Sequence, residues 1–111
     1  MNYKTISSDE ELQLLIRENL GVLLYFSRAT CHVGEALEPK VINMLKEEYP
    51  KLPFFSVDMD KTPIIAAQYA VFVEPTIIVL FEGKESIRKS RVISILELSQ
   101  SLERIYSIAF G

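Results

Sequence analysis

One thiol and one imidazole stand side by side in this sequence, as Cys31 and His32, and the 111 residues contain no second cysteine or histidine. A cysteine acts as a nucleophile through its thiolate. A protonated His32 would favour the Cys31 thiolate and could pass a proton to a leaving thiol. Both residues also have a plainer interpretation, in which Cys31 is a buried, unreactive thiol and His32 an exposed loop residue without a role.

A lone cysteine cannot form a disulfide within its own chain, which favours a reducing compartment. Because Cys31 and His32 are sequence neighbours without partners of their kind elsewhere, we predict neither a metal site nor a cofactor.

The elements that must position Cys31 are visible in the hydrophobic pattern. A buried strand over residues 22–26 precedes it, and a helix over residues 34–49 follows it, with Pro39 expected to kink or restart that helix. A cysteine just before a helix can have its thiolate stabilised by the unpaired N–H groups and dipole of the helix N-terminus. This placement favours exposure of the thiol.

The rest of the chain alternates between the two kinds of element. Capping-box patterns at Ser8 and Ser94, each with a glutamate three residues on, predict two helix starts, and Thr62-Pro63 predicts another. The predicted helices cover residues 8–19, 34–49, 62–69 and 94–106, and the predicted strands cover residues 3–6, 22–26, 54–57, 76–81 and 86–92, the last near a sheet edge. The order β-α-β-α-β-α-β-β-α predicts an α/β domain with a central mixed sheet and helices on both faces.

Length and charge narrow the classes of function. A chain of 111 residues suits a single domain over 1–111. The net charge of −3 gives no basic footprint for nucleic acid or an anionic membrane. The N-terminus is polar rather than apolar, and no uninterrupted apolar stretch reaches the roughly 20 residues that cross a bilayer. We therefore predict a cytoplasmic protein.

Two segments resemble the hallmarks of the thioredoxin family. Residues 26–39, FSRATCHVGEALEP, resemble its active-site segment, in which a buried strand ends in phenylalanine, a Trp-Cys-Gly-Pro-Cys-Lys loop opens a helix and a proline follows. Residues 73–76, VEPT, resemble its cis-proline loop, at about the usual separation from the cysteine, and Gly83 matches its hairpin glycine. The resemblance covers nearly the whole chain and implies the thioredoxin fold.

The resemblance also implies a site. Cys31 would attack a disulfide, and the backbone of Glu74, before Pro75, would pair with an extended peptide. Thr30 and Val33, on either side of the Cys31-His32 pair, would belong to the same substrate-binding surface. Glu74 has two interpretations: an inward carboxylate that disfavours the thiolate, or a solvated side chain that points away, which we favour.

Several residues depart from the family pattern. Gly34 occupies the place of the resolving cysteine, and Tyr25 that of a buried acid that assists resolution. Ser27 and Thr30 replace the two tryptophans that shape the docking surface. Arg28 could offset the charge of Glu74, whereas we interpret Asp58 and Asp60 as loop and cap residues.

Two functions remain open. The first is a monothiol protein that exchanges with a disulfide-containing protein or a low-molecular-weight thiol through Cys31, and that an external thiol resolves. The second is a redox-inactive module that binds a protein or peptide at the Cys31 and Pro75 surface. The sequence indicates neither nucleic-acid nor membrane partners, and it leaves the oligomeric state open.

Overall fold

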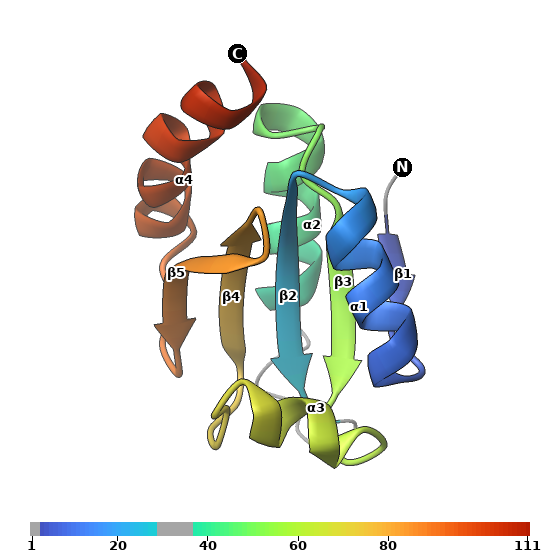
Figure 1. The fold of residues 1–111 in the computed structure, drawn as a ribbon. Coiled ribbons are helices and arrows are strands. Elements are labelled where there is room, and N and C mark those ends of the chain that lie inside the picture. Colours follow the sequence, from blue (N-terminus) through green and yellow to red (C-terminus); the bar gives the residue numbers. More distant parts are fainter. Residues whose placement is uncertain (1–2, 29–36) are drawn as a thin grey trace.

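The computed structural model describes residues 3–28 and 37–111 (Figure 1). Thr30, Cys31, His32, Val33 and Gly34 therefore lie outside the described residues. The elements in chain order are β1 (Tyr3–Thr5), α1 (Asp9–Glu18), β2 (Gly21–Ser27), α2 (Leu37–Glu48), β3 (Phe54–Asp58), α3 (Pro63–Gln68), β4 (Thr76–Phe81), β5 (Lys84–Ser90) and α4 (Ile95–Phe110). This is the predicted order, and it confirms the α/β class.

The strands form a mixed sheet in the order β1-β3-β2-β4-β5. β3 runs parallel to both β1 and β2, whereas β4 is antiparallel to β2 and β5 is antiparallel to β4. The central β2 is buried along almost its whole length, which is why it reads as a continuous apolar run. β5 lies at an edge, as its polar sequence predicts.

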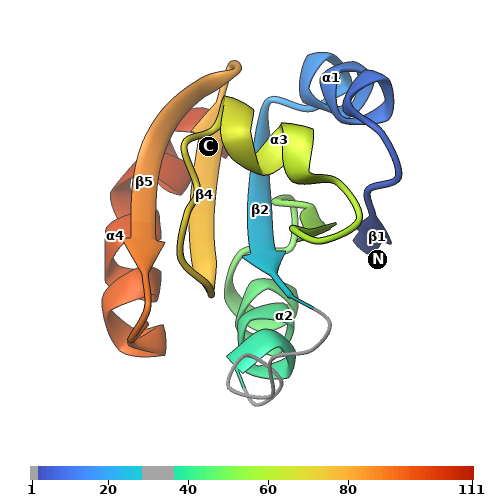
Figure 2. The ribbon, with the colours of Figure 1, turned by 90° about the horizontal axis from the view of Figure 1, so that it is seen from below.

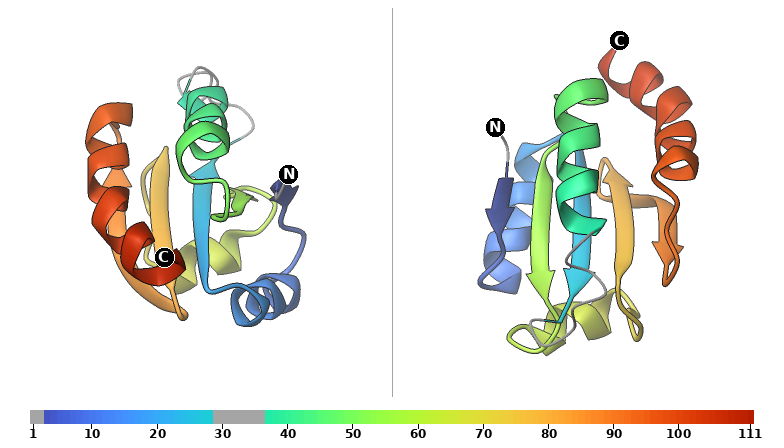
Figure 3. Two further views of the ribbon diagram at one scale, coloured as in Figure 1. Left: turned by 90° about the horizontal axis from the view of Figure 1, so that it is seen from above. Right: turned by 180° about the vertical axis from the view of Figure 1, so that it is seen from behind.

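Helices cover both faces of the sheet (Figures 2 and 3). On one face α1 and α3 supply Leu12 and Ile65 to a core with alternate residues of β2 and β4. On the other face α2 and α4 supply Val41, Leu98 and Leu102 to a second core. None of the helices within residues 3–28 and 37–111 is long and apolar enough to cross a membrane.

Both predicted capping boxes begin helices. The Ser8 hydroxyl accepts the Glu11 N–H at 3.1 Å, and the Ser94 hydroxyl accepts the Glu97 N–H at 3.2 Å. The Glu11 carboxylate accepts the N–H of Ser7 at 2.7 Å, one residue before the cap, instead of the cap's own N–H. The same local rule does not hold at Thr62, whose hydroxyl donates to the Asp58 carbonyl at 2.7 Å and caps nothing.

The boundaries of β5 differ from the prediction of residues 86–92. Glu82 and Gly83 form a two-residue turn with φ of 53° and 77°, so that Phe81 pairs directly with Lys84 and the strand starts there. It ends at Ser90 because Arg91 takes a φ of 66°, which breaks the extended backbone. Pro39 lies in the first described turn of α2, and Leu37–Glu48 is one helix.

Candidate functional site

The described residues frame the segment that holds Cys31 without including it. β2 ends at Ser27, and α2 is described from Leu37. Phe26, near the end of β2, pairs with Thr76 at the start of β4. The chain therefore leaves β2 beside the loop that precedes β4, and this loop contains Glu74 and Pro75.

The Pro75 loop is held from both sides. The Glu74–Pro75 peptide bond is cis, and Pro75 is buried. The buried hydroxyl of Thr76 donates to the Val73 carbonyl at 2.8 Å, and the Arg91 N–H donates to the Pro75 carbonyl at 2.9 Å. Within the described parts of the chain, no backbone hydrogen bond joins Glu74 to another residue. The Glu74 N–H and carbonyl are thus the backbone groups that a bound strand could use.

The Glu74 carboxylate lies at the end of β2. Its Oε2 atom accepts the Arg28 N–H at 3.3 Å, and the residue is only partly exposed. The side chain is therefore not fully solvated, and its orientation toward Cys31 lies outside the described residues. The carboxylate therefore lies against the backbone of Arg28, which precedes Cys31 by three residues in the sequence.

The Arg28 guanidinium does not offset that charge in the way the sequence suggested. It pairs with the Asp60 carboxylate, after β3, instead of with Glu74. Asp58 accepts the N–H groups of Asp60 and Lys61 at 2.8 and 3.2 Å, so it closes the loop after β3 as interpreted. Arg28 is therefore occupied by the neighbouring loop.

Tyr25 occupies the place of the family's buried acid. Its side chain is fully buried, and its ring centroid lies 5.6 Å from that of Phe54. An aromatic side chain fills the space and supplies no carboxylate. Tyr25, which departs from the family pattern as expected from the sequence, is thus a packed core residue.

Sequence reasoning missed the part played by Arg88 on β5. Its guanidinium donates to the carbonyls of Tyr69 and Ala70 at 2.6 and 3.4 Å, where the chain leaves α3 for the Pro75 loop. Glu85 holds the same guanidinium at 2.8 and 3.0 Å, and the Arg88 side chain lowers the pKa of the Glu85 carboxyl. No local pattern reveals this, because Arg88 lies among the polar residues of an edge strand.

A surface pocket beside the Pro75 loop was likewise not predicted from the sequence. It measures about 320 Å³ and is lined by residues from α3 and its flanking loops, among them Pro63, Ala67 and Val71. Phe72 borders it and is 76% exposed. An exposed aromatic ring next to the Pro75 loop is a contact surface of the kind that protein partners use.

The sheet order, the two helical layers and the loop before β4 define a protein of the thioredoxin fold. Comparison with solved structures agrees, since thioredoxin O2 from Arabidopsis thaliana superposes with a TM-score of 0.81, at 22% identity over 95% of each chain. Fasciola hepatica thioredoxin gives a TM-score of 0.78 at 26% identity, covering 96% of this chain and 98% of that one.

Residues 4–104 match the family model described as thioredoxin. The thioredoxin of Chlamydia trachomatis is 38% identical over 81 residues, which cover 67% of this chain and 78% of that protein. The thioredoxin-like protein YdfQ of Bacillus subtilis is 24% identical over 100 residues, covering 90% and 88%. The chain belongs to the thioredoxin family.

Proposed function

We propose that this chain is a monothiol member of the family, in which Cys31 takes part in thiol-disulfide exchange and an external thiol resolves the product. The observation that carries the proposal is the family match across residues 4–104. It is supported by the sequence, in which the only cysteine lies in the segment that resembles the family's active-site segment. Gly34, in the resolving position, makes the external thiol necessary. Such a cycle needs a reducing compartment, which we predict to be the cytoplasm.

The reaction balances without a cofactor. The Cys31 thiolate attacks one sulfur of a partner disulfide, the old S–S bond breaks, and the departing thiolate takes up a proton. A low-molecular-weight thiol then attacks the Cys31 sulfur and releases the partner as a thiol. A second molecule of the same thiol frees Cys31, so that two thiols supply two electrons and end as their disulfide.

The proposed site residues divide the reaction between them. His32, when protonated, favours the thiolate and supplies the proton to the departing sulfur. The Glu74 backbone, beside Pro75, pairs with an extended partner segment, a role that its free N–H and carbonyl in the described structure support. Thr30 and Val33 line the same surface.

Alkylation of Cys31 as a function of pH tests the proposal. Because the chain has one cysteine, iodoacetamide labelling followed by intact mass reports this thiol alone. We expect a midpoint well below the roughly 8.5 of a free cysteine. Glutathione disulfide should add one glutathione to the wild type and none to Cys31→Ser, and reduced glutathione should remove it. A midpoint at or above 8.5, or labelling only in denaturant, would contradict monothiol exchange.

A redox-inactive binding module is the second candidate, and the exposed ring of Phe72 beside its pocket favours it. In this case the cysteine is incidental, and Cys31→Ser retains every interaction of the wild type. Phe72→Ser would then abolish partner binding in a co-purification experiment, while Phe72→Tyr would preserve it. Loss of the interaction in Cys31→Ser would contradict the binding module and favour the monothiol protein.

A further inference from the structure

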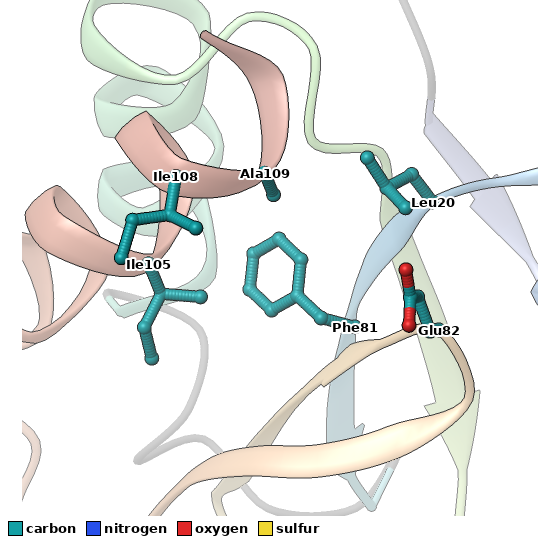
Figure 4. Close-up of a pocket in the computed structure, with 6 residues that line it drawn as sticks. All are labelled: Leu20, Phe81, Glu82, Ile105, Ile108 and Ala109. Atoms are coloured by element: carbon teal, nitrogen blue, oxygen red, sulfur yellow. The ribbon is translucent and has the colours of Figure 1, made fainter.

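A second pocket lies at the opposite end of the sheet from the Pro75 loop. It has a volume of about 370 Å³ and is lined by Leu20, Phe81, Glu82, Ile105, Ile108 and Ala109. Figure 4 shows the three α4 side chains facing Leu20 and Glu82 across the Phe81 ring. Leu20 and Ile108 remain 41% and 74% exposed, so apolar surface is left uncovered here. None of these residues takes part in the proposed exchange reaction.

The shape of this pocket is built into the sheet. Gly21 pairs with Phe81, and a Cβ atom at Gly21 would lie 2.7 Å from the Phe81 ring, so only glycine lets the ring lie over the start of β2. The Glu82 N–H donates to the Leu20 carbonyl at 2.8 Å. Leu20 and Glu82 are therefore held side by side at the mouth of the pocket.

Glu82 is an unusual residue for its backbone position. It takes the first place of the two-residue turn Glu82–Gly83, with φ of 53°, where asparagine, aspartate or glycine is favoured. A long side chain there costs conformational energy. In the described structure its carboxylate has neither an ion pair nor a hydrogen bond. Glu82 is exposed, so its carboxylate is open to a positively charged group of a partner outside the chain.

The surroundings of the pocket favour a cation. The C-terminal ends of α1 and α4 both lie at this end of the molecule, and helix C-termini carry partial negative charge (Figure 1). α4 has no basic residue in its last turn. Within residues 3–28 and 37–111, Lys51 is the cation that hydrogen-bonds to its end, with the ammonium 3.5 Å from the Phe110 carbonyl. Arg17 is the one cation among the residues of the adjoining pocket.

The adjoining pocket extends the apolar surface toward the C-terminal end of α1. It measures about 500 Å³, shares Leu20 and Glu82 with the first pocket and continues past Gly83 to Ile16 on α1. Two neighbouring hollows that share lining residues suit an extended polypeptide segment better than a small molecule. We propose that this groove binds a segment of a partner protein that carries a basic side chain, directed at Glu82, next to an apolar side chain that fills the space over Phe81.

The probe for this proposal is the peptide acetyl-Leu-Arg-Phe-amide, with acetyl-Leu-Gln-Phe-amide as its neutral match. In ¹H-¹⁵N spectra of the full chain, the arginine peptide should shift the amides of Leu20, Glu82 and Ile108. Its Kd should be about threefold lower than that of the glutamine peptide, the size of one exposed ion pair. Equal Kd values, or shifts only around Pro75, would overturn the proposal.

Glu82→Asn is the decisive variant, because asparagine suits the turn while removing the charge. It should abolish the preference for arginine and raise Tm by about 2–5 °C. Glu10→Gln, an exposed carboxylate at the start of α1, removes the same charge and should leave the preference unchanged. A preference that survives Glu82→Asn would contradict the proposal. So would a concentration-dependent dimer in sedimentation equilibrium that Ile108→Ser dissociates, since the occupant would then be a second copy.

Discussion

The Glu74 carboxylate accepts the Arg28 N–H at 3.3 Å, where the chain leaves β2 on its way to Cys31. A fixed negative charge disfavours formation of a nearby thiolate, and Arg28 does not neutralise it because its guanidinium pairs with Asp60. If Cys31 lies close to this carboxylate, as we propose, Glu74 opposes formation of its thiolate.

We expect Glu74→Gln to move the alkylation midpoint of Cys31 down by about 0.5 pH units, because the like charge is removed while the side chain keeps its size. The measurement is the pH dependence of iodoacetamide labelling in both proteins. Glu103→Gln, an exposed carboxylate on α4, serves as the control and should not move the midpoint. An unchanged or higher midpoint in Glu74→Gln would show that the carboxylate does not act on the thiol.

The Glu11 carboxylate, at the N-terminal cap of α1, makes the stability of the fold depend on pH in the acid range. The Ser7 N–H, and then Lys4 at 3.2 Å, lower the pKa of the Glu11 carboxyl below its ordinary value of 4.5. A carboxyl whose pKa is lower in the folded state stabilises the fold above the ordinary pKa, and this stabilisation is lost as the pH falls through the lower value.

Glu11→Gln should therefore lose less stability than the wild type when the pH falls from about 5.5 to 3. Urea denaturation at the two pH values measures the difference. Equal losses in wild type and Glu11→Gln would contradict the assignment.

At the scale of elements, Gly21 at the start of β2 lies against the ring of Phe81 at the end of β4. Gly21→Ala should destabilise the fold by about 1–3 kcal/mol, because its Cβ would overlap a ring that also packs against Phe110. Denaturant unfolding measures this loss. In a Phe81→Leu background the penalty of Gly21→Ala should shrink, and a penalty of the same size in both backgrounds would place the strain elsewhere.

Arg88 joins the edge strand to the end of α3. Arg88→Met should cost about 1 kcal/mol and speed hydrogen exchange at Val71, whose N–H donates to the Ala66 carbonyl at 2.8 Å just beyond the clamped carbonyls. Exchange measured by NMR resolves this amide. Arg104→Met, on the exposed side of α4, should leave Val71 protected, and unchanged exchange in Arg88→Met would show that the clamp does not hold the loop.

At the scale of the whole molecule, the sheet lies between two separate hydrophobic cores, one on each face. Leu12 belongs to one core and Leu102 to the other, and both are fully buried. Each leucine-to-alanine change should cost about 2–5 kcal/mol. Because the two sites share no partners, the double variant should equal their sum within about 0.5 kcal/mol in denaturant unfolding, and a larger deviation would reveal coupling through the sheet.

The sequence by itself determined the order of elements, the fold and the family. The order of elements rests on local signals, namely the capping serines Ser8 and Ser94 and the apolar runs of β2 and β4. The fold and the family rest in addition on the motifs around Cys31 and Pro75 and on the separation between them. A cap or an apolar run involves residues a few positions apart, so the chain carries it in readable form. The start of β5 was predicted two residues late because it depends on the conformation of the Glu82–Gly83 turn.

Only the tertiary structure decided which side chains meet. Glu74 reaches Arg28, Arg28 reaches Asp60, and Arg88 reaches the end of α3 across 18 or more positions of sequence. The pocket at the far end is assembled in the same way, from Leu20, Phe81 and Ile108. A polar side chain on a surface loop can form hydrogen bonds with several different partners. Sheet register and helix placement determine which of these partners lies within reach. These contacts depend on the packed fold as a whole and leave no local pattern in the sequence.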